Sequence, residues 1–398
     1  MLTPDDLELT RRDIALPGLP LLLDPCGLRE VLAGLGLDRG PVEVIYLRYK
    51  PGTSVVAGLL FTAERELAFA TAYAGTARPK LAKNRRYAGR ARPAMFAVDE
   101  VAGLVVGSAS ADRWLPGVRR IGRRAGALPG LPRPMALTPL RYKPARRWVA
   151  RAEDGDGPVA VVKVHPARVA RALVATQRRL QAAGAPVPAL LGADERGIVV
   201  TGWSPGRVLD VLSTDPTDHE VAGQALAGLH AVPALAGLRV APDSGRQLRS
   251  AVAAVRTVAP KAGEVAAATA AALLGQLPQR THCVAVHGDF SPDQVVRGPA
   301  GAGLVDLDRA HAGDPAGDLA SYLAARLCAG ATYDEAAEPL LAGYAEGGGT
   351  LPPPSALRPL TATAVLALAD EPFRHRHRQW RDRVHERVAL AAALAGSS

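Results

Sequence analysis

Hydrophobic and polar positions alternate with a period of two in several short stretches of the first half of the chain. The clearest of these stretches are 54–60, 67–73, 148–152 and 159–165. This period predicts half-buried β-strands rather than helices. After the last of them, residues 167–183 show helical spacing that ends at Gly184, with Pro186 and Pro188 just beyond.

The strand pattern of this half occurs twice. The motif LRYKP stands at 47–51 and again at 140–144, an offset of 93 residues. Downstream, AVDEVAGLVV at 97–106 corresponds to GADERGIVV at 192–200, which places Gly103 opposite Gly197. An internal repeat of this kind indicates a duplicated unit. The pattern of each copy predicts three antiparallel strands, then a helix and then a two-stranded hairpin.

From about Pro205 onward the apolar residues follow a helical period. The predicted helices cover 218–230, 246–258 and 263–277. A sheet-rich first half and a helical second half together indicate an α+β protein.

The composition limits the classes of protein that remain. The chain of 398 residues is 48% hydrophobic, which is enough for more than one packed unit. Its apolar runs are too short to span a bilayer, and the opening residues MLTPDDLELTRRD carry acids where a secretory signal is basic and apolar. The three cysteines lack the spacing of a zinc site or a disulfide framework. We therefore expect a cytoplasmic protein that binds no membrane.

The net charge of +10 is concentrated in two clusters, at 113–151 and 374–387. Basic clusters can bind nucleic acid. No zinc-finger spacing, heptad repeat or aromatic-rich RNA-binding strand accompanies these two. We interpret them as solvated surface and expect no nucleic-acid partner.

One lysine in the second copy has no counterpart in the first. Lys163 interrupts the apolar strand at 159–165, where a charge is costly unless it is paired. A strand-borne lysine is what a nucleotide site uses to hold phosphates. At the same offset the first copy has Ala70, which cannot make such a contact.

The densest group of polar residues in the chain lies in its second half. HGDFSPDQ at 287–294 and LVDLDR at 304–309 place Asp289, Gln294 and Asp306 at the ends of short predicted strands. Phosphoryl transfer needs a group that orients the attacking hydroxyl and oxygen ligands for magnesium. Asp289 suits the first role, and Gln294 and Asp306 suit the second, with Asp308 as the alternative to Asp306. We interpret His287 as a residue that fixes the loop rather than as a nucleophile.

These motifs resemble the catalytic and metal loops of the aminoglycoside phosphotransferase-like kinases. AVVKVH at 160–165, VVTGWSPGRVL at 199–209, LAGLH at 226–230 and GDPAGDLA at 313–320 resemble further segments of that family. The resemblance covers about 138–330 and implies a protein-kinase-like bilobal fold, here with a duplicated, degenerate N-terminal small lobe. It implies an ATP- and Mg²⁺-dependent kinase that phosphorylates a hydroxyl of a small molecule.

The resemblance also implies residue roles. Asp289 is the implied catalytic residue, Gln294 and Asp306 are the implied metal ligands, and Asp318 is implied to hold the large-lobe scaffold. The residues implied to bind the nucleotide are Lys163, Arg146 and Trp203.

The chain departs from the family pattern at two points. Gln294 stands where the family usually has Asn, a feature that resembles the maltokinases, as does the extra N-terminal cap. The helix glutamate that usually pairs with the strand lysine is absent, since 164–187 contains no acid. Lys163 is then expected to pair with Asp306 or to approach Gln177. The alternative function is a pseudokinase that binds nucleotide, or a peptide for a partner protein.

We divide the chain into three parts: a degenerate small-lobe-like cap (1–135), a nucleotide-binding small lobe (136–204) and a helical large lobe (205–398). We expect the arginines of 374–387 to line the substrate side of the large lobe and to repel a polycation. The predicted acceptor is therefore neutral or anionic. Trp380 is interpreted as a core residue, with stacking on a sugar ring as the alternative.

Overall fold

The structure, a computed structural model, describes residues 1–91, 95–123, 128–132, 134–233, 238, 244–277, 283–299 and 301–396. The described residues form two compact units. The first, here the sheet unit, comprises Met1–Ala172, Leu191–Gly202 and Pro372–Trp380. The second, the helical unit, comprises Leu173–Leu190, Trp203–Glu371 and Arg381–Ser398.

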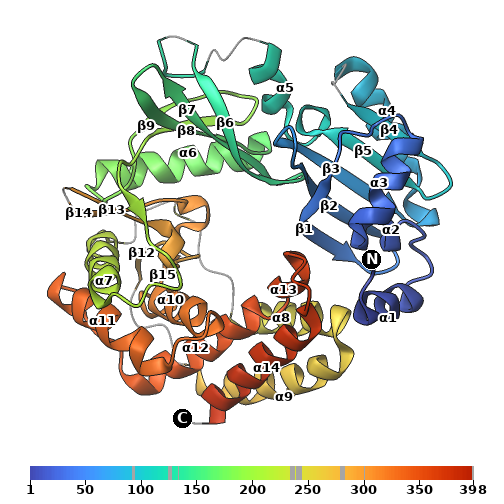
Figure 1. Cartoon of the computed structure of the whole chain (residues 1–398). Helices are drawn as coiled ribbons and strands as arrows, with labels where there is room; N and C mark the ends of the chain where they lie inside the picture. The colour runs from blue at the N-terminus through green and yellow to red at the C-terminus, as the bar shows by residue number, and fades with distance from the viewer. Residues whose placement is uncertain are drawn as a thin grey trace. The chain divides into compact units, whose positions relative to one another are not determined.

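The first half of the sheet unit contains a five-stranded sheet with the strand order β1-β2-β3-β5-β4 (Figure 1). Its strands are β1 (Val42–Lys50), β2 (Ser54–Phe61), β3 (Glu66–Tyr73), β4 (Phe96–Asp99) and β5 (Leu104–Ser108). The helices of this half are α1 (Pro4–Arg12), α2 (Leu19–Leu23), α3 (Pro25–Gly34), α4 (Pro79–Ala91) and α5 (Pro116–Arg123).

A second five-stranded sheet follows with the equivalent order β6-β7-β8-β10-β9. Its strands are β6 (Ala136–Lys143), β7 (Arg147–Asp154), β8 (Gly157–Val164), β9 (Leu190–Ala193) and β10 (Ile198–Gly202), and α6 (Ala167–Ala182) lies between β8 and β9 in the chain. The same order of strands and the same position of the helix confirm the repeat. The predicted helix at 167–183 is confirmed within one residue.

The two glycines that mark the repeat have the same backbone conformation and the same backbone contact in both copies. Gly103 and Gly197 have φ of +64° and +90°, a region that favours glycine. Their carbonyls accept hydrogen bonds from the Tyr73 and His165 amides at 3.0 and 2.9 Å. A Cβ would lie 2.7 Å from the Tyr73 carbonyl oxygen in the first copy and 1.9 Å from that of His165 in the second. The shared motif thus reflects a shared close approach of two backbones.

The Tyr-Lys-Pro turns are pinned by aspartates outside the repeated motif. In the first copy, Asp13 accepts hydrogen bonds from the Tyr49 hydroxyl at 2.7 Å and the Gly52 amide at 2.9 Å. In the second, Asp112 accepts from the Tyr142 hydroxyl at 3.0 Å and the Ala145 amide at 2.7 Å. Burial raises the pKa of Asp112, against the effect of these hydrogen bonds. The structural repeat therefore begins upstream of the motif that revealed it.

The residue after the proline differs between the two turns, and this difference allows a prediction about stability. Gly52 and Ala145 both have left-handed φ, +59° and +61°. A Cβ on Gly52 would meet nothing within 4 Å, so Gly52→Ala changes backbone strain alone. We expect Gly52→Ala to cost about 1 kcal/mol and Ala145→Gly to gain less than about 1 kcal/mol, because glycine also loosens the unfolded chain. Thermal unfolding of both variants tests this, and a destabilised Ala145→Gly protein would contradict it.

The pairing register of the strands corrects the match of Lys163 with Ala70 that the sequence offset gave. Lys163 on β8 lies opposite Val149 and Val199. In the first copy the residue between the equivalent neighbours, Val56 and Val105, is Thr71 rather than Ala70. The β7–β8 hairpin is one residue shorter than the β2–β3 hairpin, so the constant offset fails there. The first copy still has no lysine at this place.

The two sheets share one hydrophobic core. Side chains of the first copy, such as Phe69 and Val105, belong to the same buried cluster as Trp148 and Val162 of the second. The two sheets approach each other at Gly58, where a Cβ would lie 3.3 Å from the Tyr142 carbonyl oxygen. The two copies of the repeat therefore pack on each other within the sheet unit.

The helical unit contains the three predicted helices as α7 (Pro216–His230), α8 (Ser244–Val258) and α9 (Pro260–Gln276). Helix α7 begins earlier than predicted because Asp215 caps it, accepting from the Thr217 amide, with Pro216 at its first position. The remaining helices are α10 (Ala316–Cys328), α11 (Tyr333–Glu346), α12 (Pro354–Leu368), α13 (Glu371–Arg374) and α14 (Trp380–Gly396).

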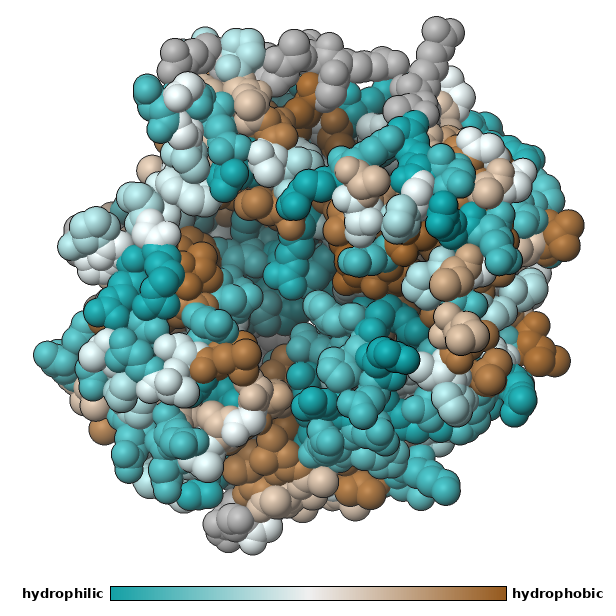
Figure 2. Space-filling view, in the orientation of Figure 1, coloured by the Kyte–Doolittle hydropathy of each residue, from teal (hydrophilic) through white to brown (hydrophobic). Residues whose placement is uncertain are grey.

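Two small sheets carry the polar loops of this unit. One has the order β11-β13-β14, with β11 (Arg207–Val208), β13 (Val295–Gly298) and β14 (Gly301–Leu304). The other pairs β12 (Val284–Val286) with β15 (His311–Gly313). Among the described residues, no helix is long and apolar enough to cross a membrane. The face shown in Figure 2 is mostly hydrophilic, with hydrophobic residues in scattered groups.

Candidate active site

The loop that follows β12 carries Asp289 on the surface of the helical unit. Its neighbours His287 and Phe290 are buried, whereas 52% of the Asp289 side chain is exposed. Gly288 has φ of +77°, and a Cβ there would lie 2.5 Å from the Arg309 carbonyl oxygen. The glycine therefore allows this loop to approach the LVDLDR loop closely.

That approach gives Asp289 a charged partner. The Arg309 guanidinium donates to the Asp289 carboxylate at 3.0 Å. Arg309 follows Asp306 by three residues, so its side chain links the two loops of the predicted site. The sequence analysis quoted this arginine in its motif but assigned it no role.

The two predicted metal ligands are held beside each other by the backbone. The Val305 amide donates to the Gln294 carbonyl at 2.9 Å, which brings residue 294 next to the residue that precedes Asp306. Asp306 has a left-handed φ of +61° and starts a short 3₁₀ turn at Leu307–Arg309. A non-glycine residue in this region is strained, and such strain clusters at functional sites.

The Gln294 side chain fits the role of a metal ligand. Only 8% of the residue is exposed, so the amide lies at the edge of the protein interior. Its side-chain oxygen is a neutral ligand of the kind that a divalent cation accepts. Amide and carboxylate oxygens are the ligands that Mg²⁺ takes in proteins. The residues present at this place therefore fit a magnesium ion.

A buried carboxylate holds the loop that carries Asp289. Asp318, on α10 and 2% exposed, accepts hydrogen bonds from the backbone amides of His287 at 2.6 Å and Gly288 at 2.8 Å. Burial alone would raise the pKa of Asp318. The hydrogen bond from His230 and the charges nearby outweigh burial and hold the pKa below its usual range. An ionised Asp318 thus fixes the backbone directly before Asp289.

His287 connects the two loops a second time. Its side chain is buried, and Nε2 donates to the Val305 carbonyl at 2.8 Å. Its ring also contacts Phe290, with ring centroids 5.7 Å apart. These contacts support the interpretation of His287 as a residue that fixes the loop.

Two buried histidines on α7 complete the support, and the sequence analysis gave neither a role. His230 lies 3.1 Å from Asp318 through Nε2 and 2.9 Å from the Tyr344 hydroxyl through Nδ1. In the contact with Asp318, Nε2 is the donor, because an ionised carboxylate can only accept. His219 lies 2.7 Å from the Tyr322 hydroxyl, and the Tyr322 ring lies 5.2 Å from the ring of Phe290, in the loop that carries Asp289. Burial lowers the pKa of His219, which favours its neutral form.

The predicted nucleotide residues fall in both units. Lys163 and Arg146 belong to the sheet unit, and Trp203 is the first residue of a segment of the helical unit. Lys163 is half-buried on β8, on the face opposite the fully buried Val162 and Val164. Arg146 is exposed in the β6–β7 turn, and Trp203 is half-buried after β10. Their part in nucleotide binding stays a prediction.

The pairing of Lys163 also stays a prediction. Gln177 on α6, one of its two expected partners, donates its side-chain amide to the Pro188 carbonyl at 2.6 Å. Asp306, the other, belongs to the helical unit.

The arginine-rich segment at 374–387 differs in part from expectation. Trp380 is fully buried, so its stacking on a sugar ring is wrong and the core interpretation is confirmed. Arg376 pairs with the buried Asp6, and Arg387 donates to the Leu368 carbonyl at 2.6 Å. The guanidinium groups of these two arginines are therefore engaged with partners inside the protein.

Comparisons with known proteins place the chain in a family. Residues 119–360 match the model of the phosphotransferase enzyme family. Curated proteins provide no match.

Solved structures show the fold. A choline/ethanolamine kinase family protein from Mesorhizobium loti matches with 18% identity and a TM-score of 0.51, covering 70% of this chain and 94% of that one. A choline kinase from Cryptosporidium parvum matches with 9% identity and a TM-score of 0.51, covering 66% and 89%. A macrolide 2′-phosphotransferase from Brachybacterium faecium has 22% identity and a TM-score of 0.45, covering 69% and 97%. The first two matches confirm the expected α+β, protein-kinase-like bilobal fold.

Proposed function

The chain belongs to the phosphotransferase enzyme family, and from that premise we propose that it transfers the γ-phosphate of ATP to a hydroxyl group of a small molecule with the help of Mg²⁺. The observation that carries this proposal is the pair of loops around Asp289 and Asp306. Asp318 and His287 hold these loops together from the buried side. Phosphoryl transfer depends on positioning and electrostatics more than on covalent chemistry of the protein, and rigid loops suit it.

Each side chain has a distinct role in the proposal. Asp289, exposed and fixed through its backbone, would orient the acceptor hydroxyl and take its proton. Gln294 and Asp306 would hold Mg²⁺, which neutralises charge on the phosphates when bound. Lys163, with Arg146 and Trp203, would bind the nucleotide.

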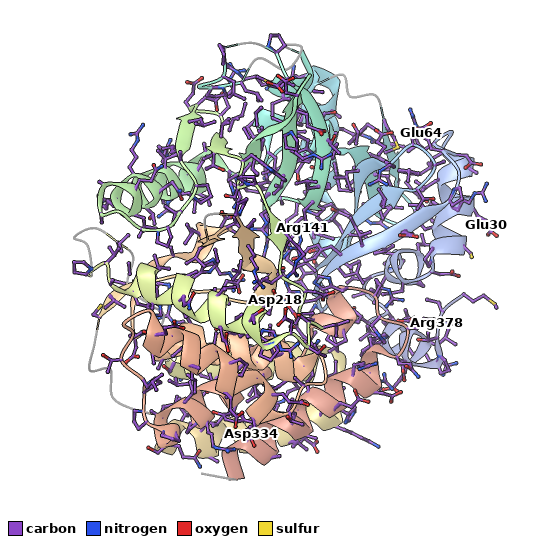
Figure 3. The ribbon with its side chains drawn as sticks, turned by 60° about the vertical axis from the view of Figure 1, so that its left-hand side comes forward. Glu30, Glu64, Arg141, Asp218, Asp334 and Arg378 are labelled. Atoms are coloured by element: carbon purple, nitrogen blue, oxygen red, sulfur yellow. The ribbon has the colours of Figure 1, made fainter. Side chains whose placement is uncertain are left out.

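We propose a neutral or anionic acceptor. The support for this acceptor class comes less from the arginines of 374–387 than from Arg309. Arg376 and Arg387 are bound within the protein, although Arg378 remains exposed (Figure 3). Closer to the chemistry, Arg309 neutralises the one carboxylate that the acceptor hydroxyl must approach. A polycation gains little from a carboxylate already paired with arginine.

The direct test is transfer of labelled phosphate from Mg²⁺-ATP to a panel of neutral sugars, sugar acids and kanamycin-type polycations at moderate salt. Labelled product from a neutral or anionic acceptor supports the proposal. A kcat/KM for a polycation at least about tenfold above all other acceptors would contradict the acceptor class.

A second candidate function is that of a nucleotide-binding pseudokinase. The observation that favours it is the absence of any acid on α6, the helix expected to supply a partner for the strand lysine. Nucleotide binding without transfer to any acceptor or to a cell extract would favour this candidate.

Lys163→Ala tests whether Lys163 contacts the phosphates of the nucleotide. A charge-assisted contact with phosphate is worth about 1.5–3 kcal/mol, so kcat/KM for ATP is expected to fall by about tenfold to a hundredfold. Lys83→Ala, which removes an exposed lysine on α4, is the matched control and is expected to leave the rate unchanged. Steady-state kinetics at varied ATP concentration provide the measurement. Equal values for Lys163→Ala and the wild type would remove Lys163 from the proposal.

A further inference from the structure

A short C-terminal segment folds with the N-terminal residues of the chain. Pro372–Trp380 belongs to the sheet unit, although Glu371 before it and Arg381 after it belong to the helical unit. The segment includes most of α13 and ends at the first residue of α14. The chain therefore leaves the helical unit, contributes nine residues to the sheet unit and returns.

Asp6 is the centre of this association. It lies on α1 and is fully buried. The Arg376 guanidinium donates to both Asp6 carboxylate oxygens at 2.9 Å, and the Trp380 indole donates to one of them at 3.0 Å. Arg376 also donates to the Leu23 carbonyl at the end of α2, at 2.9 Å. A buried carboxylate requires such a partner, and a bidentate arginine is the most specific one.

Aromatic residues of β1 complete the contact. The Phe373 ring lies 6.2 Å from the Tyr49 ring and 5.0 Å from the Trp380 ring. His375 meets the Tyr46 ring edge-on at 6.5 Å, and the Arg374 guanidinium lies 5.7 Å from the centroid of the same ring. Phe373 and Trp380 are at most 1% exposed, so the segment fills a built site rather than lying on a surface.

The residues on either side of the segment also contact each other. Arg387 of α14 donates to the Leu368 carbonyl at 2.6 Å and pairs with Glu371 at 3.6 Å. These contacts lie in the helical unit and join the residues that flank the segment. The excursion is thus a loop fixed at both its tip and its base.

The first copy of the repeat contributes Tyr46 and Tyr49 to this site but has Thr71 where the second copy has Lys163. We propose that the N-terminal copy, together with α1, is an intramolecular docking module whose ligand is the chain's own 372–380 segment. It binds this segment through Asp6 and the β1 tyrosines. The proposal does not depend on phosphoryl transfer.

Limited trypsin digestion of the full chain tests the docking, because Arg374, Arg376 and Arg378 are potential cleavage sites inside the segment. In the wild type we expect these bonds to resist cleavage. Asp6→Asn and Arg376→Gln should each raise the rate of cleavage after Arg374 or Arg378 at least about tenfold, because each breaks the buried pair. The double variant should be cleaved no faster than the faster single variant, since both remove one interaction.

Glu30→Gln is the matched control, because it removes an exposed carboxylate from α3 of the same unit (Figure 3). It is expected to match the wild type. Wild-type cleavage rates in both Asp6→Asn and Arg376→Gln would overturn the proposal, as would equal acceleration by Glu30→Gln. Cleavage of Asp6→Asn throughout the sheet unit would mean that this variant unfolds the unit. Arg376→Gln is then the deciding variant, because it leaves the α1 capping box of Thr3 and Asp6 intact. Segment-specific cleavage of Arg376→Gln then supports the docking, and its absence refutes it.

Discussion

Asp289→Asn is expected to lower kcat by about 10²- to 10⁴-fold while the affinity for Mg²⁺-ATP changes only a few fold. Asparagine keeps the shape of the side chain and its exposure on the loop, but it cannot take a proton from the acceptor. The backbone of the loop should remain in place, since Asp318 binds the amides of His287 and Gly288 rather than the Asp289 side chain. The loss is therefore expected in the transfer step alone.

Single-turnover transfer and nucleotide titration together check this result. Asp293→Asn is the control, because Asp293 is an exposed aspartate four residues away that contacts the Ser291 hydroxyl. Its rate should stay within about twofold of the wild type, as expected for a surface substitution. Transfer by Asp289→Asn at the wild-type rate would exclude Asp289 as the catalytic group.

Asp318→Asn should damage both folding and transfer. Asp318 accepts from two backbone amides and from His230, and asparagine would present an NH₂ group to at least one of these donors. Removing one partner of a buried charged network costs about 3–5 kcal/mol. The catalytic loop would also lose its support, so transfer should fall even under conditions where the protein stays folded. Thermal unfolding and kcat, measured on the same preparation, test the two effects.

The dependence of stability on pH gives a second readout for Asp318. Its pKa is lowered in the folded protein, so the ionised group stabilises the fold above the ordinary pKa of about 3.9. That stability is lost as pH falls through the lower, folded-state pKa. Asp318→Asn should therefore lose less stability than the wild type over this acid range. Asp314→Asn is the control, because the Asp314 side chain accepts a hydrogen bond from the Ala316 amide and from none of the groups that bind Asp318. It should keep the wild-type profile.

Much of the local structure followed from the sequence because the signals are local. Alternation identified β2, β3, β7 and β8, and helical spacing with Gly184 and its following prolines identified α6. The repeat was visible because the same backbone approach at Gly103 and Gly197 demands the same residue. The order of motifs around Asp289 and Asp306 indicated the family to which the chain belongs.

Other features depended on distances that no local pattern encodes. The correspondence of Lys163 with Ala70 was wrong because one hairpin is a residue shorter, and only the strand register reveals that Thr71 takes the place. The contact of Arg309 with Asp289 was missed because it depends on how closely two loops pass. The role of His230 was missed because its partner Asp318 lies 88 residues further along the chain.

The sequence by itself therefore determined the strands, the helices, the repeat and the family, since each is a pattern that can be recognised along the chain. Only the tertiary structure decided which of these residues meet. Arg376 was interpreted as part of a basic, solvated surface, yet it pairs with the buried Asp6, 370 residues away in the chain. Trp380 was interpreted as a core residue, but only the structure shows that its indole donates to the same carboxylate. The physical reason is that burying a charge or an indole depends on a partner of matching geometry, and folding brings that partner from a remote part of the chain.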